Sequence, residues 1–383
     1  VPAFVAEATN QDMLKMAGIH HKNCFAIISL FEDDIKNSQI ATISKLLNKN
    51  LDVIVKGTSK QHIQHYEHMG LKHIQNPFEI VSERIYYGIT SPHIWLLEMW
   101  VYGHILKLRD RDRFPKGKYI VCGYGRMGQA ITNGLNKAGV EYVLYPIDSQ
   151  EYKKSKQSTI FGDDEDIEKL LELGVMHSNC IIAVTKNDLL NLSILNQAKN
   201  LNPDIFTIAR ENSLDDITIF KASKVNKAYI VEEILANTTY NYLARPLAYI
   251  FINEVRKKSE KWGKTIVKMM NYITGMNPLY FEITINNRDA YALSEALRRD
   301  DKITLADLRR SRSDNTKRLN IVYLLLKRED EIFLLPHSSM KLKLDDELLI
   351  SSNEDAQEDF EYIINNIYEL NYVLENRNKI DRT

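Results

Sequence analysis

The sequence has 383 residues, 44% of them hydrophobic, which suits two or three globular domains and excludes a disordered protein. Its 50 Lys and Arg residues are balanced by 51 Asp and Glu residues, which argues against a general nucleic-acid binder, because such a protein needs a net basic surface. The three cysteines, Cys24, Cys122 and Cys180, include no CxxC pair, so they indicate neither a disulfide framework nor a zinc site. A reducing compartment fits them best.

The longest apolar stretch, residues 94–106, contains Glu98 and His104 and is shorter than the roughly 20 apolar residues of a membrane span. We therefore expect no span within this sequence. The chain opens on Val1 and an apolar run without a signal peptide, and we expect this start to be internal to a longer polypeptide.

Residues 14–37 resemble residues 170–191, which indicates a duplicated domain. The aligned pairs are Gly18 with Gly174, Cys24 with Cys180, and Asn37 with Asn191. The offset is 156 residues at the glycines and 154 at the asparagines, so the copies differ by a two-residue loop change.

Both copies continue with the same order of predicted elements: a helix, a β-branched strand, a second helix and a last strand. These are residues 39–47 and 53–55, with a last strand near Ile74, in the first copy, and residues 192–199 and 205–208, with a last strand near Tyr229, in the second. Strands that alternate with amphipathic helices predict a parallel, doubly wound α/β sheet.

Only the second copy has an upstream half within this sequence. Residues 118–122 predict a strand, Gly123, Gly125 and Gly128 follow it, and a helix continues to about Ala138. Three glycines between a strand and a helix permit a tight turn, the close approach of a pyrophosphate, and close packing of the helix on the sheet. A further strand is predicted over residues 141–147, and it ends at Asp148, where an acid can accept hydrogen bonds from a ribose.

In their order, these motifs resemble the RCK domain, the regulator of potassium conductance, also known as the TrkA N-terminal domain. The motifs are VCGYGRMG at 121–128, Asp148, GDD at 162–164, LGV at 173–175, Thr185 with Asn191, and IAR at 208–210. The resemblance implies a Rossmann-like domain that binds NAD(H) or an adenine nucleotide (ATP, ADP or AMP), in some members metal ions, and whose dimers assemble into a ring that gates a pore.

Carried over by position, the resemblance implies that the glycine loop cradles phosphates, Asp148 holds the ribose, Asp163 lies beside the adenine and Arg210 reaches phosphate. The implied cofactor-binding residues are Gly123, Tyr124, Gly125, Arg126, Met127, Gly128, Asp148, Gly162, Asp163, Asp164, Thr185 and Arg210. Asp164 departs from the usual Ala, which leaves the preferred nucleotide open. The first copy has AEA at 6–8, with Gly57 or Thr58 where Arg210 aligns, so we expect a degenerate half retained for assembly.

The predicted domains follow in order. They are an incomplete RCK half (1–85), a helical linker (86–117), the complete nucleotide-binding RCK domain (118–235), crossover helices (236–275), a TrkA C-terminal-type α/β domain (276–352) and an amphipathic helical tail (353–383). We expect the crossover helices to break at Pro246, and the resemblance implies that they clasp a dimer partner; an ordinary connector is the alternative. The tail predicts a helix that docks on its own domain or on a neighbouring subunit.

The resemblance implies a ligand-sensing gating-ring module of a potassium channel, and we expect no enzymatic activity. The resemblance implies a homodimer or higher ring, with a tetramer of tandem RCK units expected, joined to a membrane-embedded potassium pore on the cytoplasmic side of the inner membrane. The alternatives are a peripheral Trk or Kef subunit and an NAD-dependent oxidoreductase that uses His177 or Lys186. Metal binding by His62, His65 and His68, and redox sensing by Cys122, remain minor hypotheses.

Overall fold

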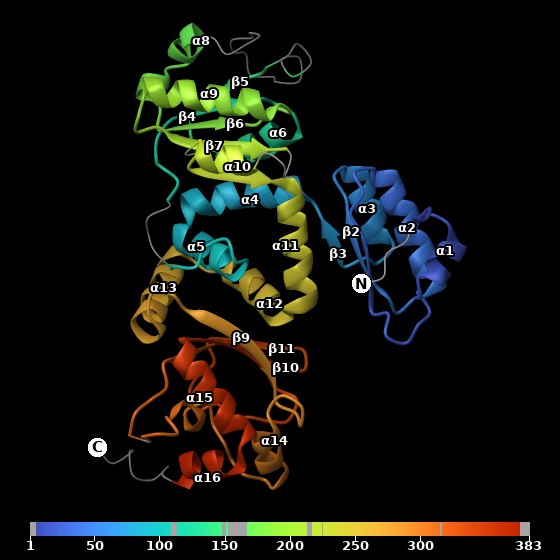
Figure 1. The fold of residues 1–383 in the computed structure, drawn as a ribbon, viewed down its shortest axis with the longest axis vertical. Helices are drawn as coiled ribbons and strands as arrows, with labels where there is room; N and C mark the ends of the chain where they lie inside the picture. The colour runs from blue at the N-terminus through green and yellow to red at the C-terminus, as the bar shows by residue number, and fades with distance from the viewer. Residues whose placement is uncertain are drawn as a thin grey trace. The chain divides into compact units, whose positions relative to one another are not determined.

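A computed structural model describes residues 5–108, 113–147, 151, 167–212, 217–223, 225–314 and 316–375 (Figure 1). The chain divides into two compact units, and each unit combines two separate stretches of sequence. The first unit contains residues 1–89 and 114–239, and the second contains residues 90–113 and 240–383. No helix among the described residues combines the length and the apolar character that a bilayer crossing needs.

The first copy forms a sheet of three parallel strands among the described residues, in the order β1-β2-β3. Its elements are α1 (Gln11–Met16), β1 (Ala26–Ser29), α2 (Asp34–Leu47), β2 (Asp52–Lys56), α3 (Lys60–His68), β3 (His73–Gln75) and α4 (Pro77–Thr90). Asp33 and Ser59 begin α2 and α3, because their side chains accept the first free N–H groups of each helix. Val53, Val55 and Tyr66 form the centre of the small core.

The second copy forms a sheet of five parallel strands among the described residues, in the order β5-β4-β6-β7-β8. Its elements are β4 (Tyr119–Cys122), α6 (Arg126–Lys137), β5 (Tyr142–Tyr145), α8 (Ile167–Glu172), η1 (Val175–His177), β6 (Cys180–Ala183), α9 (Asp188–Leu201), β7 (Phe206–Glu211), α10 (Ile217–Ala222), β8 (Lys227–Ile230) and α11 (Val231–Ala244). The direction of winding reverses between β4 and β6, which is where doubly wound sheets bind ligands. β5 is shorter than predicted, since Pro146 offers no N–H to a strand.

The strand registers show how the two copies correspond. Ala26 lies opposite Asp52 and Ile54 opposite His73 in the first sheet, and Cys180 lies opposite Phe206 and Ile208 opposite Lys227 in the second. Every pair is therefore shifted by 154 residues. The predicted equivalence of Cys24 with Cys180 is wrong, because the two-residue loop change precedes β1 and Ala26 takes that place.

The same register corrects the position that corresponds to Arg210. Arg210 lies opposite Tyr229, and Lys56 lies opposite Gln75, so Lys56 and not Gly57 or Thr58 is its counterpart. The first copy therefore keeps a basic residue at this position.

In the second unit, α5 (Pro92–Val101) packs against α12 (Pro246–Val255) and α13 (Glu260–Thr274). The helices break before Pro246 as predicted, and again before α13, where Ser259 caps the new helix. Glu98 is fully buried on α5 and pairs with Arg256, whose Nη2 lies 2.9 Å from its carboxylate. This ion pair accounts for the acid within the longest apolar stretch of the sequence.

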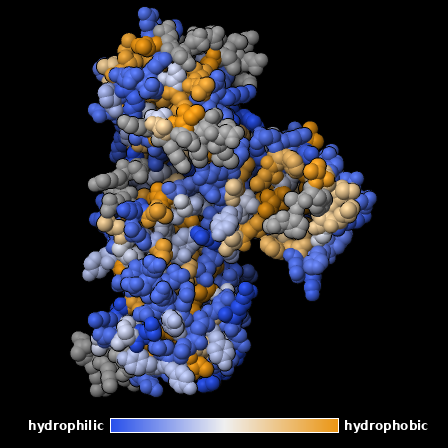
Figure 2. Space-filling view, in the orientation of Figure 1, coloured by the Kyte–Doolittle hydropathy of each residue, from blue (hydrophilic) through white to orange (hydrophobic). Residues whose placement is uncertain are grey.

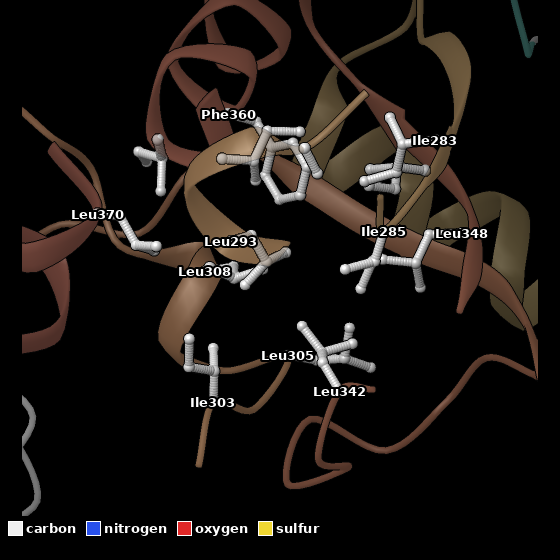
Figure 3. Close-up of a cluster of buried hydrophobic side chains, with 14 of the residues drawn as sticks. Ile283, Ile285, Leu293, Ile303, Leu305, Leu308, Leu342, Leu348, Phe360 and Leu370 are labelled. Carbon is white, nitrogen blue, oxygen red and sulfur yellow. The ribbon is translucent and has the colours of Figure 1, made fainter. Parts of the chain in front are cut away.

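The C-terminal part forms an antiparallel sheet in the order β11-β10-β12-β9. Its elements are β9 (Leu279–Thr284), α14 (Tyr291–Arg298), η3 (Asp307–Arg309), β10 (Ile321–Arg328), β11 (Glu331–Leu334), β12 (Glu347–Ser352), α15 (Glu354–Asn365) and α16 (Ile367–Glu375). The predicted tail is two helices that meet at Asn366, and they dock on their own module: Phe360 and Leu370 point into the same cluster as Ile283 and Leu293 (Figure 3).

The predicted fold class is confirmed: two Rossmann-like parallel sheets, the first incomplete, precede a small α/β module. Phe25, Ile28 and Ile35 of the first copy are exposed, and Figure 2 shows apolar side chains gathered on the visible face of this copy. In the second copy, the strand that corresponds to β1 is β6, and β4 pairs with one of its edges.

Candidate functional site

The loop between β4 and α6 is shaped by its glycines. Gly123 has φ +99°, and a Cβ atom there would lie 3.1 Å from the main chain of Val184. A Cβ on Gly128 would lie 2.1 Å from the carbonyl oxygen of Gly123. Gly125 is the N-cap of α6 and has no side chain, so the cap residue itself leaves the first N–H groups of this helix uncovered. The loop therefore presents main-chain donors and the positive end of a helix, the arrangement that favours an anion.

A cavity of about 710 Å³ opens at this loop and at the carboxyl ends of β6 and β7. Its lining residues are Gly125, Arg126, Ile147, Glu151, Val184, Thr185, Lys186, Asn187, Leu190, Arg210 and Asn212. The volume lies within the range of small-molecule sites, roughly 300 to 1,000 Å³. The cavity thus occupies the position at which doubly wound sheets hold their ligands.

The structure brings four of the predicted residues together on this cavity: Gly125, Arg126, Thr185 and Arg210. Gly123, Tyr124, Met127 and Gly128 shape the loop behind it, and Met127 is fully buried. The other four, Asp148, Gly162, Asp163 and Asp164, lie outside the described residues.

Glu151 is a lining residue that the sequence analysis missed. Its Oε2 accepts the main-chain N–H of Tyr124 at 2.7 Å and that of Ile147 at 3.2 Å. The carboxylate is therefore held against the glycine loop, where it can accept hydrogen bonds from hydroxyl groups of a ligand. Its place shortly after the predicted ribose acid is the sequence signal that could have identified it.

A hydrogen-bond network of Asn191 fixes the opposite wall. Its side chain accepts the N–H of Thr185 at 2.8 Å and donates to the carbonyl oxygens of Thr185 and Arg210, at 3.2 Å and 3.0 Å. Asp188 accepts the N–H of Asn212 at 2.9 Å, which holds the end of β7 in place. Neither Asp188 nor Asn212 was predicted, although Asp34 repeats the acid in the first copy.

Two guanidinium groups give the cavity a positive charge. Burial lowers the pKa of Arg210, the nearby Arg126 lowers it further, and Glu232, Asp188 and Glu32 act in the opposite direction. The buried Nε of Arg210 has no hydrogen-bond partner among the described residues. A donor left without an acceptor beside a second cation favours an anionic ligand, because such a ligand supplies both the acceptor and the countercharge.

The two copies match one known family. Residues 1–77 and 119–231 match the TrkA-N domain. The chain is a TrkA-N, or RCK, domain protein. The first TrkA-N domain of this chain is the three-stranded copy, and the second TrkA-N domain is the one that carries the cavity.

Among curated proteins, this TrkA-N protein resembles Potassium channel protein 1 of Methanocaldococcus jannaschii, with 28% identity over 138 residues, which are 34% of this chain and 41% of that protein. A Trk system potassium uptake protein TrkA homolog of Pyrococcus horikoshii is 26% identical over 136 residues, which are 33% of this chain and 60% of that protein. The chain thus spans less than two thirds of the length of both relatives.

Two solved structures share the fold over most of the TrkA-N protein. The GsuK channel bound to NAD has a TM-score of 0.53 at 13% identity, with 94% of this chain and 70% of that chain covered. The GsuK RCK domain has a TM-score of 0.50 at 13% identity, with 94% and 84% covered. At this level of identity the likeness establishes the fold.

In this TrkA-N protein the minor hypotheses find little support. Among the described residues no group of three or more His, Cys, Asp or Glu side chains could hold a metal ion, and His62 instead contacts Ser59 at 3.0 Å and Asp34 at 3.4 Å. Cys122 is fully buried, and burial raises the pKa of its thiol to about 12, which disfavours the reactive thiolate. Lys186 lines the cavity, but His177 does not.

Proposed function

We propose that this chain is the ligand-sensing, gating-ring part of a potassium channel, and that it binds NAD(H) or an adenine nucleotide (ATP, ADP or AMP) in the second TrkA-N domain to control K⁺ flux. The observation that carries the proposal is the cavity at the β4–β6 switch point, with its glycine loop and Arg210. The names of similar proteins support the role in controlling K⁺ flux, since one relative is a potassium channel protein and a solved neighbour is a channel bound to NAD.

The residues around the cavity suit the parts of a nucleotide. Gly125 and the start of α6, with Arg126 and Arg210, would hold phosphates through N–H groups and positive charge. Glu151 would accept hydrogen bonds from ribose hydroxyls alongside Asp148, the acid predicted for this role. We assign Gly162, Asp163 and Asp164 to the base end by resemblance to the family.

Regulation requires that the nucleotide bind two arrangements of the ring with different affinity, since a ligand can shift an equilibrium only by that difference. We propose a homodimer or a higher ring, with a tetramer of tandem units as the expected assembly. It would act on a potassium pore at the cytoplasmic side of the inner membrane. The crossover helices over residues 236–275, which include most of α11 and all of α12 and α13, are the proposed contact between partners.

A peripheral subunit of a Trk or Kef transport system is the second candidate, and the similarity to TrkA homologs favours it. The two candidates differ in whether the chain shares a polypeptide with the pore. Purification of the natural full-length protein, followed by a flux measurement without added subunits, separates them. We propose a regulatory rather than an enzymatic role, since both matched regions belong to the TrkA-N family. Of the two candidate proton donors of an oxidoreductase, Lys186 lines the cavity and His177 does not.

The test is a titration of the 383-residue chain with NAD⁺, NADH, AMP, ADP and ATP by calorimetry. We expect at least one of them to bind and Arg210→Ala to weaken that binding about 10- to 100-fold, because the variant loses a charged phosphate contact. Arg288→Ala is the matched control, since the side chain of Arg288 is 94% exposed on the C-terminal module. Absence of binding by the wild type would contradict the function, and unchanged binding by Arg210→Ala would contradict the site.

A further inference from the structure

The first TrkA-N domain places an acid beside the phosphate loop of the second. Oε2 of Glu32, which follows β1, lies 3.7 Å from Nη2 of Arg126, the first residue of α6. Oε1 of the same carboxylate pairs with the ammonium group of Lys56. Glu32 therefore lies between a cation of each domain.

Lys56 keeps Glu32 in this place. The side chain of Lys56 is only 2% exposed, and Glu32 is its ion-pair partner. A buried ammonium group without a countercharge is strongly unfavourable, so this pair anchors the carboxylate to the first domain. Lys56 is also the counterpart of Arg210 in the repeat, which places the anchor at the first domain's own carboxyl edge of β2.

Arg126 is held less firmly than Lys56. Its side chain is 57% exposed, and its guanidinium lies 4.9 Å from the centre of the Phe78 ring at the start of α4. Exposed ion pairs contribute little to stability, roughly 0 to 1 kcal/mol, so a stronger anion can draw Arg126 away from Glu32. Arg210 belongs to the same charge cluster, since both Glu32 and Arg126 act on its pKa.

We propose that the carboxylate of Glu32 competes with the phosphates of a bound nucleotide for the guanidinium group of Arg126. The inference rests on the proposed function, because it assumes that a nucleotide occupies the cavity that Arg126 lines. A phosphate group carries more negative charge than one carboxylate and accepts two parallel N–H bonds from arginine. A nucleotide bound to the second domain then breaks the ion pair between Arg126 and Glu32. The first domain thereby loses a contact with the second when the nucleotide binds.

Competition predicts a dependence on the number of phosphates. Glu32→Gln removes the competing charge, so ATP and ADP should bind about two- to fivefold more tightly to this variant, the effect of one exposed ion pair. AMP should gain least, because it has the least phosphate charge to place near Arg126. Calorimetric titration of each nucleotide into wild type and variant measures these ratios.

Glu67→Gln is the matched control, since Glu67 is an exposed acid on α3 of the same domain and its loss changes the net charge equally. The inference is overturned if Glu32→Gln binds ATP no more tightly than Glu67→Gln does, or if AMP and ATP gain equally. If the wild type binds no nucleotide, the proposed function itself fails, and that result differs from both of these.

A second pair of variants covers the case in which Glu32→Gln unfolds because Lys56 loses its partner. Lys56→Met with Glu32→Gln removes both charges, and Lys56→Met alone provides its reference. Relative to Lys56→Met alone, the double variant should gain more affinity for ATP than for AMP. A double-mutant cycle of Glu32→Gln and Arg126→Gln in urea unfolding gives an independent readout: the coupling should be present without nucleotide and absent at saturating ATP. A coupling that ATP leaves unchanged contradicts the inference.

Discussion

Asn37 and Asn191 make the same two links in the two TrkA-N domains. Oδ1 of Asn37 accepts the N–H of Phe31 at 2.9 Å, and its Nδ2 donates to the carbonyl oxygen of Lys56 at 3.2 Å. Asn191 does the same with Thr185 at 2.8 Å and Arg210 at 3.0 Å. Both amides are fully buried, and each ties the ends of two neighbouring strands together. The second of these links holds the cavity wall.

Removal of the Asn191 amide should therefore affect both stability and binding. Asn191→Ala removes three side-chain hydrogen bonds to the main chain of Thr185 and Arg210, although the carbonyl oxygen of Thr185 keeps the side chain of Asn212 as a donor. The loss should lower the free energy of unfolding by about 2 to 3 kcal/mol in a urea titration. Nucleotide affinity should fall as well, since Thr185 and Arg210 lose their support. Asn37→Ala is the control: it should destabilise by a similar amount without weakening nucleotide binding, because Asn37 supports Lys56 and the neighbour of Glu32 and not the cavity wall. If both variants weakened nucleotide binding equally, Asn191 would have no specific role in supporting the cavity wall.

The glycine loop between β4 and α6 should not tolerate a side chain at Gly128. The Cβ of an alanine would lie 2.1 Å from the carbonyl oxygen of Gly123, so the loop and α6 must separate. We expect Gly128→Ala to lower the free energy of unfolding by about 1 to 3 kcal/mol and to weaken nucleotide binding. Asn133→Ala, an exposed position on the same helix, should have neither effect. Wild-type affinity in Gly128→Ala would show that the ligand does not depend on the close approach of this loop.

The buried ion pair of Glu98 and Arg256 should contribute strongly to the second unit. Arg256→Met leaves the carboxylate of Glu98 buried without this partner, which should lower the free energy of unfolding by about 3 to 5 kcal/mol. The double variant with Glu98→Gln should recover part of that loss. Lys257→Met, next in sequence and 66% exposed, should change the unfolding midpoint little. A small effect of Arg256→Met would mean that other groups compensate Glu98.

Glu282 should make the second unit less stable as the pH rises. Burial raises the pKa of its carboxyl group, although the N–H groups of Ala248 and Leu247 act against this. A folded-state pKa above the unfolded value means that the folded state binds the proton more tightly. The resulting stability is present below about pH 4.5 and is lost as the pH rises through the raised pKa.

Urea unfolding from about pH 4 to about pH 7 measures this effect. The free energy of unfolding of the wild type should fall relative to that of Glu282→Gln over this range. Glu358→Gln, which replaces an exposed acid on α15, should track the wild type at every pH. A difference between wild type and Glu282→Gln that is constant with pH would contradict the assignment.

The sequence predicts best what local chemistry dictates. The glycines at 123, 125 and 128 and the break at Pro246 are consequences of backbone geometry, and the stripe that carries Phe360 follows from helical periodicity. The register of the repeat was missed by two residues because the loop before β1 has no geometric signature. Glu151, like the pairing of Glu98 with Arg256 over 158 residues, depends on tertiary contact alone. The contact of Glu32 with Arg126 was hidden for the same reason.

The second unit is built from residues 90–113 and residues 240–383, with a whole Rossmann-like sheet between them in the sequence. During synthesis, α5 leaves the ribosome long before α12 and α13, so Trp95, Leu97 and Trp100 must remain uncovered while the second TrkA-N domain folds. The nascent chain thus exposes the apolar helix α5 to solvent while the residues that follow it are synthesised. We therefore expect residues 92–101 to lack their helical packing partners until residues 246–274 have been synthesised, which would not hold for a chain with consecutive domains.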